Sequence, residues 1–391
     1  MRHIRGGENE NENENQNENQ NENQNENENQ NQNGNENENQ NENQNQNGNG
    51  NEGVIQQINK NIERIRVIIL LFGFIVVAAE PSLKAQDIHF SQIDVNPIIY
   101  NPAYTGFFDG GTRLGVSYRN QWATVSRAFQ TMAATAECAV VRRRYYRDGV
   151  SIGVILYNDR AGTLQYGTTA GNISVSYFKG IGNKGDNFIS LALQGGGGQS
   201  GFNIAEIDME DPTELIEKTS STFMTLGAGV AWFYQPSDEL YFKIGLAGHN
   251  LNQPNISYTA MSAASIERRF SGYARGEYRA WSNVSVLPLI ACMVQRSYRE
   301  VLLGCDAKWY VSESTGSTLA FSGGIHYRWR DAALVEFTAE WNSFIFALTY
   351  DANISKLTPA SRSVGALEIG IVYRTKASKR VKRKALPCPG M

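Results

Sequence analysis

The chain has 391 residues, a formal net charge of −3 and only four cysteines. Its first 53 residues consist almost entirely of Asn, Glu and Gln. Such a tract has no apolar side chains to bury and cannot offset the entropy lost on ordering. Residues 1–53 are therefore predicted to be a disordered extension or the product of a mis-assigned translation start. Without residues 1–85, the chain carries 30 Lys and Arg against 25 Asp and Glu, a net charge of +5.

Residues 54–85 have the three parts of a secretory signal peptide. These parts are a basic region, an apolar core at 67–79 and a cleavage site, with key residues Lys60, Arg64, Arg66, Leu83 and Ala85. The apolar core has 13 residues, fewer than the roughly 20 that a membrane-spanning helix needs. Cleavage before Gln86 is expected to release an exported protein. No Cys follows the cleavage site, so a lipoprotein anchor is not expected.

Downstream of the signal, apolar and polar residues alternate with a period of two. In 112–120, one face carries Leu114, Val116 and Tyr118 and the other carries Arg113, Gly115, Ser117 and Arg119. Similar alternation recurs at 241–249, 301–311, 333–342 and 367–374. A period of two is typical of β-strands with two different faces.

This alternation predicts fourteen strands, an even number as in bacterial outer-membrane barrels. The strands are expected at 111–121, 129–140, 149–158, 164–177, 187–198, 222–234, 240–250, 269–280, 284–295, 300–311, 317–328, 332–342, 344–351 and 365–374. Longer connections at 199–221 and 251–268 are expected to be extracellular. An even count then places the segment 86–110 and the tail 375–391 in the periplasm.

The apolar faces could form the core of a soluble β-sandwich or the lipid-facing wall of a barrel. Small or charged residues occupy the opposite face in strand after strand, as in a polar lumen. Aromatic residues recur near strand ends, as in interfacial girdles: Tyr118, Tyr157, Tyr177, Tyr234, Tyr241, Tyr327, Trp341, Tyr350 and Tyr373. With an export signal, this pattern is typical of an outer-membrane β-barrel, which leaves no unpaired edge in lipid. A soluble secreted β-protein is the alternative.

The sequence offers little catalytic chemistry. Cys138, Cys292, Cys305 and Cys388 have no metal-ligand spacing, although Cys292 and Cys305 lie on neighbouring predicted strands where a disulfide is possible. The run Gly195–Gly198 lacks the Lys-Ser/Thr of a phosphate loop. We therefore expect no enzyme activity, cofactor or metal. The tail 374–384 has seven basic residues and no acid, and in an exported protein it indicates a solvated end or contact with an acidic partner or lipid headgroups rather than nucleic acid.

The segment 86–110 contains two Asn-Pro pairs, Asn96-Pro97 and Asn101-Pro102. Pro removes a backbone donor and pushes the preceding residue away from helical geometry, so the pairs exclude the interior of a helix or a central strand. Because the segment is also rich in polar and aromatic residues, we predict an ordered element packed against the barrel.

Several blocks of the chain resemble the PorP/SprF family. HFSQ (89–92), NPAYTG (101–106) and RNQW (119–122) are similar to its N-terminal hallmark, GHNLNQPNISY (248–258) to a middle block, and YDANISKLTPAS with GALEIGIVY (350–373) to its C-terminal part. The ending PCP (387–389) is also similar, although the family closes with a short aromatic-containing end and this chain closes with Gly390-Met391.

The resemblance implies a FadL-like outer-membrane barrel of the type IX secretion and gliding machinery, with its N-terminal segment as a plug at the periplasmic mouth. It implies as partners outer-membrane lipids, periplasmic ring lipoproteins and the C-terminal signal domain of secreted adhesins. Candidate plug or docking residues are His89, Phe90, Gln92, Asn96, Pro97, Asn101, Pro102, Arg119, Asn120, Gln121, Trp122, His249 and Asn250. They could equally serve only to hold the fold. The alternative function is a FadL-type channel for a hydrophobic solute, with a lateral opening at a kinked strand.

Overall fold

A computed structural model describes residues 88–122, 128–143, 147–162, 166–182, 185–202, 219–258, 264–314, 317–355 and 364–375. The low-complexity tract, the signal peptide and the tail beyond Thr375 lie outside the described residues. Their sequence-based assignments remain predictions.

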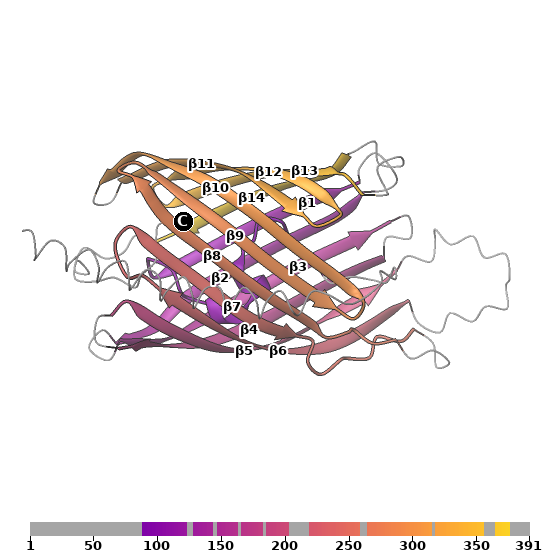
Figure 1. Cartoon of the computed structure of the whole chain (residues 1–391). Helices are drawn as coiled ribbons and strands as arrows, with labels where there is room; N and C mark the ends of the chain where they lie inside the picture. Colours follow the sequence, from indigo (N-terminus) through magenta and orange to yellow (C-terminus); the bar gives the residue numbers. More distant parts are fainter. Residues whose placement is uncertain are drawn as a thin grey trace, which may run out of the picture. The chain divides into compact units, whose positions relative to one another are not determined.

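Fourteen antiparallel strands close into one barrel, in which each strand pairs with its neighbours in sequence and β1 pairs with β14 (Figure 1). The strands are β1 (Thr112–Gln121), β2 (Phe129–Arg143), β3 (Asp148–Ala161), β4 (Tyr166–Ile181), β5 (Asn187–Gly201), β6 (Ser220–Tyr234), β7 (Leu240–His249), β8 (Arg269–Trp281), β9 (Val284–Gln295), β10 (Tyr298–Ser314), β11 (Ser317–Arg328), β12 (Ala332–Trp341), β13 (Phe344–Asn353) and β14 (Val364–Arg374). This confirms the predicted all-β barrel and its strand number. Several strands extend past the predicted ends because cross-strand pairing continues beyond the alternating pattern.

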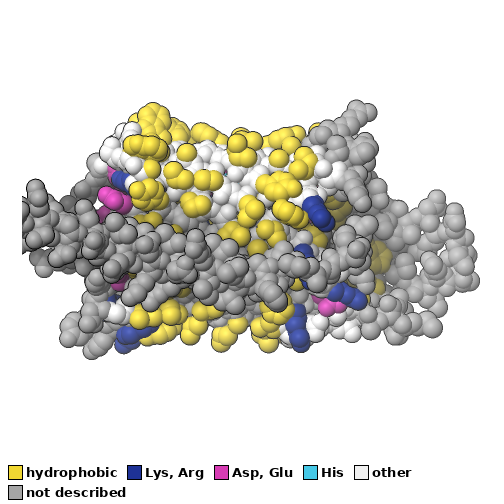
Figure 2. Space-filling view, viewed as in Figure 1, with side chains coloured by type: hydrophobic (Ala, Val, Ile, Leu, Met, Phe, Trp, Pro, Cys, Tyr) yellow, Lys and Arg dark blue, Asp and Glu magenta, His cyan; other side chains and the backbone are white. Residues whose placement is uncertain are grey.

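The period-two pattern places apolar side chains on the outside of the barrel and polar side chains on the inside. On β1, Leu114 and Val116 are 44% and 56% exposed, whereas Arg113 and Arg119 are buried. Apolar side chains cover much of the outer surface that is visible in Figure 2. Within the described residues, no helix is long and apolar enough to cross a membrane.

The two ends of the barrel differ in the length of their connections. We call the end where β1 begins and β14 ends the terminal end, and the opposite end the loop end. Connections at the terminal end are short: 144–147, 182–186, 235–239, 282–283, 315–316 and 342–343. Those at the loop end are 122–128, 162–165, 202–219, 250–268, 296–297, 329–331 and 354–363, and the longest of all connections, 202–219 and 250–268, are among them. The two expected long connections therefore share one end.

The chain before β1 lies inside the barrel and forms two short helical turns, α2 (Pro97–Tyr100) and η1 (Pro102–Tyr104). Each begins with the Pro of an Asn-Pro pair, where the missing N–H costs no helical hydrogen bond. Asn101 caps η1, because its side-chain oxygen accepts a hydrogen bond from the backbone N of Ala103 at 2.8 Å. The pairs thus set turns inside the lumen.

The core of the molecule is the contact between this N-terminal segment (residues 88–111) and the barrel wall. Ile98 and Ala103 are fully buried, and Phe90 and Tyr104 nearly so. The ring of Phe107 stacks on that of Phe233, with 3.4 Å between centroids. The segment and apolar residues of the strands, such as Phe233 and Leu334, therefore form one buried core.

Candidate functional site

The N-terminal segment spans the lumen from the loop-end half to the terminal end. At its start, Arg269, the first residue of β8, donates to the carbonyl of Ile88 at 2.9 Å. At its other end, Arg142 donates to the carbonyls of Gly106 at 3.0 Å and Phe108 at 3.1 Å. The even number of strands shows that the segment leaves the barrel at the terminal end, at Gly111. The contact with Arg269 shows that the segment begins deep in the barrel.

A buried charge cluster binds the start of the segment, and we call it the Glu368 cluster (Ser91, Arg119, Arg328, Asp351 and Glu368). The carboxylate of Glu368 accepts hydrogen bonds from the backbone N of Ser91 at 2.8 Å and of Gln92 at 3.1 Å, and it pairs with Arg119. Arg328 pairs with Asp351 at 3.0 Å and donates to the Ser91 hydroxyl. Hydrogen bonds between charged groups are the strong ones, so this cluster fixes the position of Ser91 and Gln92.

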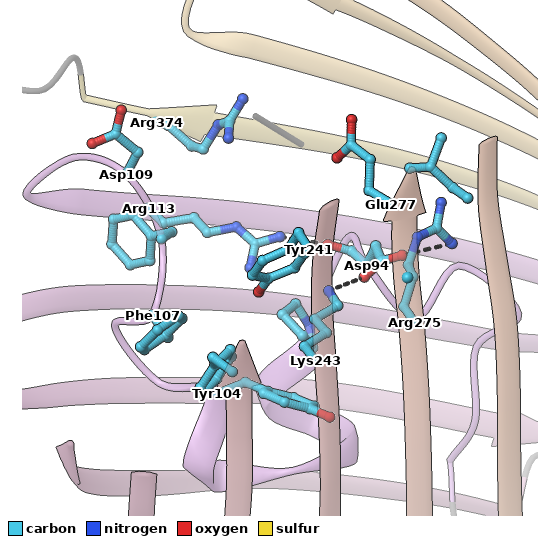
Figure 3. Close-up of a pocket in the computed structure, with 15 residues that line it drawn as sticks. Asp94, Tyr104, Phe107, Asp109, Arg113, Tyr241, Lys243, Arg275, Glu277 and Arg374 are labelled. Atoms are coloured by element: carbon cyan, nitrogen blue, oxygen red, sulfur yellow. Dashed lines mark hydrogen bonds and ion pairs between the residues drawn. The ribbon is translucent and has the colours of Figure 1, made fainter. Parts of the chain in front are cut away.

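A second cluster binds the middle of the segment, and we call it the Asp94 cluster (Asp94, Arg113, Lys243, Tyr273 and Arg275). The Asp94 carboxylate contacts Lys243 at 2.5 Å and Arg275 at 2.9 Å (Figure 3). It also accepts a hydrogen bond from the Tyr273 hydroxyl at 2.7 Å. Arg113 donates to the carbonyl of Asp94 at 2.5 Å. Burial acts to raise the pKa of Asp94, but the charges of Arg275 and Lys243 outweigh it and hold this pKa well below its ordinary value.

Two buried asparagines of the segment dock against strand positions that lack a side chain. Asn96 donates to Ser117 Oγ and accepts from Thr135 Oγ1, both at 2.6 Å. Asn101 donates to the carbonyls of Val230 at 3.0 Å and Leu246 at 3.2 Å. A Cβ on Gly229 would lie 2.1 Å from the side-chain oxygen of Asn101, so only glycine permits this approach.

Two histidines, His89 of the segment and His249 of β7, form contacts in the loop-end half of the barrel. The ring Nε2 of His249 lies 3.0 Å from the carbonyl oxygen of Tyr100, which only accepts, so this nitrogen carries the hydrogen. The ring of His89 lies 3.7 Å from the Glu300 carboxylate. Burial lowers the pKa of His89, and the opposing effect of Glu300 does not offset it. Burial therefore favours the neutral form of His89.

Most of the candidate plug or docking residues meet inside the barrel. Buried within it are Phe90, Gln92, Asn96, Pro97, Asn101, Pro102, Arg119, His249 and Asn250, while His89 is partly exposed. Asn120, Gln121 and Trp122 are instead partly exposed at the loop end of β1. Gln121 accepts from Arg119 at 3.3 Å, and the backbone N of Trp122 donates to Gly365 at 2.8 Å. These residues thus contact the protein itself, and docking of a partner by them remains a prediction.

Apart from Arg119, the charged partners of the segment are not among the candidate residues from the sequence. The period-two alternation places Arg113, Lys243 and Glu368 on the polar faces of their strands. This placement is the only signal in the sequence for their role. Glu368 and Ser91 lie 277 positions apart, and no local pattern pairs such residues.

The structure also addresses two open alternatives of the sequence. Cys292 and Cys305 are free, and in the β9–β10 register they face Val301 and Pro288 rather than one another. At Gly195–Gly198, β5 pairs with β4 and β6 without a register shift. The glycine run therefore lies inside β5, with continuous pairing on both sides, and not at a strand end. Nor do the described residues include a group of three or more His, Cys, Asp or Glu arranged to hold a metal.

Solved structures with a similar chain path include hydrocarbon transport barrels. The toluene transporter TbuX of Ralstonia pickettii has a TM-score of 0.44 and 9% identity, over 72% of this chain and 93% of that one. The toluene transporter TodX of Pseudomonas putida has a TM-score of 0.40 and 8% identity, over 73% and 94%. The CymD monoaromatic hydrocarbon channel has a TM-score of 0.43 and 9% identity, over 72% and 93%. At these scores the likeness is distant, and nothing that follows rests on it. No curated protein matches the sequence.

The family comparison covers most of the chain. Residues 82–373 match the model of the type IX secretion system membrane protein PorP/SprF. The match contains the N-terminal segment and the barrel up to Tyr373, one residue before the end of β14. The chain therefore belongs to the PorP/SprF family of type IX secretion system membrane proteins and is an outer-membrane β-barrel.

Proposed function

We propose that this protein is a non-enzymatic outer-membrane component of the type IX secretion and gliding machinery. Its barrel docks periplasmic ring lipoproteins, anchors a secreted adhesin through the adhesin's C-terminal signal domain, or does both. A cleaved signal peptide ending at Ala85 exports it, and outer-membrane lipids surround the apolar strand faces. Membership of the PorP/SprF family is the observation that carries this proposal.

The proposal gives the barrel an orientation. Bacterial outer-membrane barrels have short periplasmic turns and longer extracellular loops. All connections at the terminal end have two to five residues, whereas the longest connections lie at the loop end, so the terminal end faces the periplasm. The C-terminal tail and the exit of the N-terminal segment then share the side where ring lipoproteins are found.

The filled lumen supports a docking role over a diffusion role. The N-terminal segment is held by the Glu368 cluster in one half of the barrel and by the Asp94 cluster further along. A hydrophobic solute would have to displace these ion pairs to pass. A scaffold, in contrast, gains rigidity from them.

A deletion strain and an affinity purification test the proposal together. The strain lacking this protein is expected to lose surface display of at least one type IX cargo, and the full-length chain restores it. Tagged protein purified from membranes is expected to recover ring lipoproteins or an adhesin C-terminal domain. A deletion strain that secretes and displays every type IX cargo would contradict the proposal. Uptake of a hydrophobic solute by purified protein in liposomes would favour the channel instead.

A further inference from the structure

Four arginines lie at the loop end of four consecutive strands, β8 to β11. Arg296 and Arg330 belong to the short turns that follow β9 and β11. Arg268 directly precedes β8, and Arg299 is the second residue of β10. Basic side chains are visible at the loop-end margin of the apolar surface in Figure 2. We call these four residues the arginine rim, because they follow one edge of the lipid-facing wall.

The alternation of the chain directs two of these arginines out of the lumen. Arg268 is exposed, whereas the next residue, Arg269, is buried inside the barrel. Arg299 is followed by Glu300, whose carboxylate lies 3.7 Å from the ring of His89 in the lumen. Because successive side chains of an extended chain point to opposite faces, Arg268 and Arg299 lie on the outer face.

Aromatic side chains lie directly below the rim, on the outer face at the end of β11. Tyr327 and Trp329 pack edge to face, with 6.0 Å between ring centroids, and Trp329 is 57% exposed. The backbone N of Arg330 donates to the Tyr327 hydroxyl at 3.3 Å, so Arg330 lies at the outer side of its turn. In outer-membrane barrels, aromatic residues mark the boundary between lipid tails and headgroups. Arg330 therefore lies at the level of the headgroups.

Two acids of the described rim already have cation partners, whereas Arg330 has a charge to offer. Glu267 pairs with Arg296 at 3.0 Å, and Asp331 pairs with the buried Arg328 at 3.2 Å. Arg330 is exposed and forms no ion pair with any residue that the structure describes. The four arginines thus exceed the two acids, one of which neutralises a cation of the lumen. The described part of the rim can therefore receive an anion.

A phosphate-bearing lipid fits both parts of this surface. Guanidinium groups bind phosphate through paired, charge-assisted hydrogen bonds, and cations beside a bilayer attract anionic headgroups. Below the rim, Trp329, Ile325 and Leu303 are exposed where the acyl chains of the same lipid would lie. A free anion would contact only the arginines.

We propose that the arginine rim is a binding site for a phosphorylated lipid headgroup of the outer leaflet, with Arg330 as its central contact. This inference rests on the orientation in the proposed function, in which the loop end faces outward, and it needs no particular secretion partner. The bound lipid would hold the β8–β11 sector of the wall at a fixed depth in the membrane.

Binding of lipid A, a phosphorylated and acylated sugar, to the full-length protein in neutral-detergent micelles tests the rim. Native mass spectrometry measures the fraction of protein with bound lipid. We expect Arg330→Gln to bind about tenfold more weakly than the native chain, because it loses a charge-assisted hydrogen-bond contact with phosphate. Arg160→Gln, which changes an exposed arginine at the loop end of β3, is the matched control and should bind like the native chain. Equal affinity of the native chain and Arg330→Gln would overturn the proposal.

Two further probes identify the part of the ligand that is recognised. Dephosphorylated lipid A should bind the native chain as weakly as lipid A binds Arg330→Gln. Inorganic phosphate at the same concentration as the lipid should not displace it. Binding that is unaffected by dephosphorylation, or lipid that is displaced by phosphate, would overturn the assignment to a lipid headgroup. Heat-dependent migration in SDS gels reports whether each variant has folded.

Photo-crosslinking in the native outer membrane tests the place and the orientation of the rim together. Trp329 is replaced by p-benzoylphenylalanine, and Trp281, which is exposed at the terminal end of β8, carries the same label in the control. We expect a link to lipid A-containing lipid from position 329 and not from position 281. A link from 281 alone would reverse the orientation and overturn the inference with it. Equal links from both positions, or none, would overturn the rim as a site and leave the secretion proposal standing.

Discussion

Arg119 and Glu368 form a buried ion pair although they lie 249 positions apart in the chain. They are direct partners in the register of β1 and β14, the strands that close the barrel. The same carboxylate accepts two backbone hydrogen bonds from Ser91 and Gln92. One interaction therefore joins barrel closure to the placement of the N-terminal segment.

Glu368→Gln is expected to destabilise the protein by about 3 kcal/mol, because it leaves Arg119 with less compensation in a buried site. Urea-unfolding midpoints of the protein refolded in lipid vesicles measure this effect. The control Glu313→Gln breaks an exposed ion pair and is expected to cost less than about 1 kcal/mol. Similar midpoints for the two variants would show that the Glu368 cluster does not secure the segment.

The lowered pKa of Asp94 predicts that the protein becomes less stable in acid. Its pKa in the folded protein lies below the ordinary value of 3.8, so the unfolded chain binds more protons as the pH falls through this range. The stabilisation is thus fully present above about pH 5 and is lost as the pH approaches the folded-state pKa. The urea midpoint of the native protein should fall between about pH 5 and pH 3.

The variant Asp94→Asn isolates this effect from that of other acids. It should be less stable than the native protein at pH 7, by about 3 kcal/mol, since Lys243 and Arg275 lose their shared partner. Its midpoint should also change less with pH over the acid range. The same pH dependence in both proteins would contradict the assignment of the acid loss to Asp94.

Gly229→Ala tests how closely Asn101 docks. The added methyl group would lie 2.1 Å from the side-chain oxygen of Asn101, so the segment must shift. Overpacking of this kind costs about 1–3 kcal/mol. In Gly323→Ala, the nearest atom to the added carbon is 3.9 Å away, and this control is expected to unfold at nearly the native urea concentration.

Leu193→Arg tests whether the exposed apolar face lies in lipid. Leu193 is 71% exposed near the middle of β5, a site where a soluble protein would accept Arg. At the centre of a bilayer, the same substitution costs about 2–4 kcal/mol. The urea midpoint in vesicles measures the loss, and Asp238→Arg in the exposed 235–239 turn serves as the control. A midpoint unchanged by Leu193→Arg would exclude a lipid-facing position.

The sequence by itself determined the strands and their two faces. Leu114, Val116 and Tyr118 alternate with Arg113, Ser117 and Arg119, and in the structure these two sets face outside and inside as the alternation predicts. The Asn-Pro pairs likewise predicted breaks in the N-terminal segment, where the structure has α2 and η1. Both features are local, because side-chain period and the backbone limits of proline act within a few residues.

Only the tertiary structure decided which inward-facing groups meet. The alternation places Arg113, Lys243 and Glu368 on polar faces, but it does not show that Arg113 and Lys243 bind Asp94 or that Glu368 binds Ser91. It also gave no reason to separate Glu277, whose Oε2 accepts no hydrogen bond from the described residues, from the paired acids around it. These contacts depend on barrel closure and strand register, which bring together residues far apart in the chain. Charge pairing inside the lumen is therefore a property of the closed barrel, whereas the strands that form it can be read from neighbouring residues.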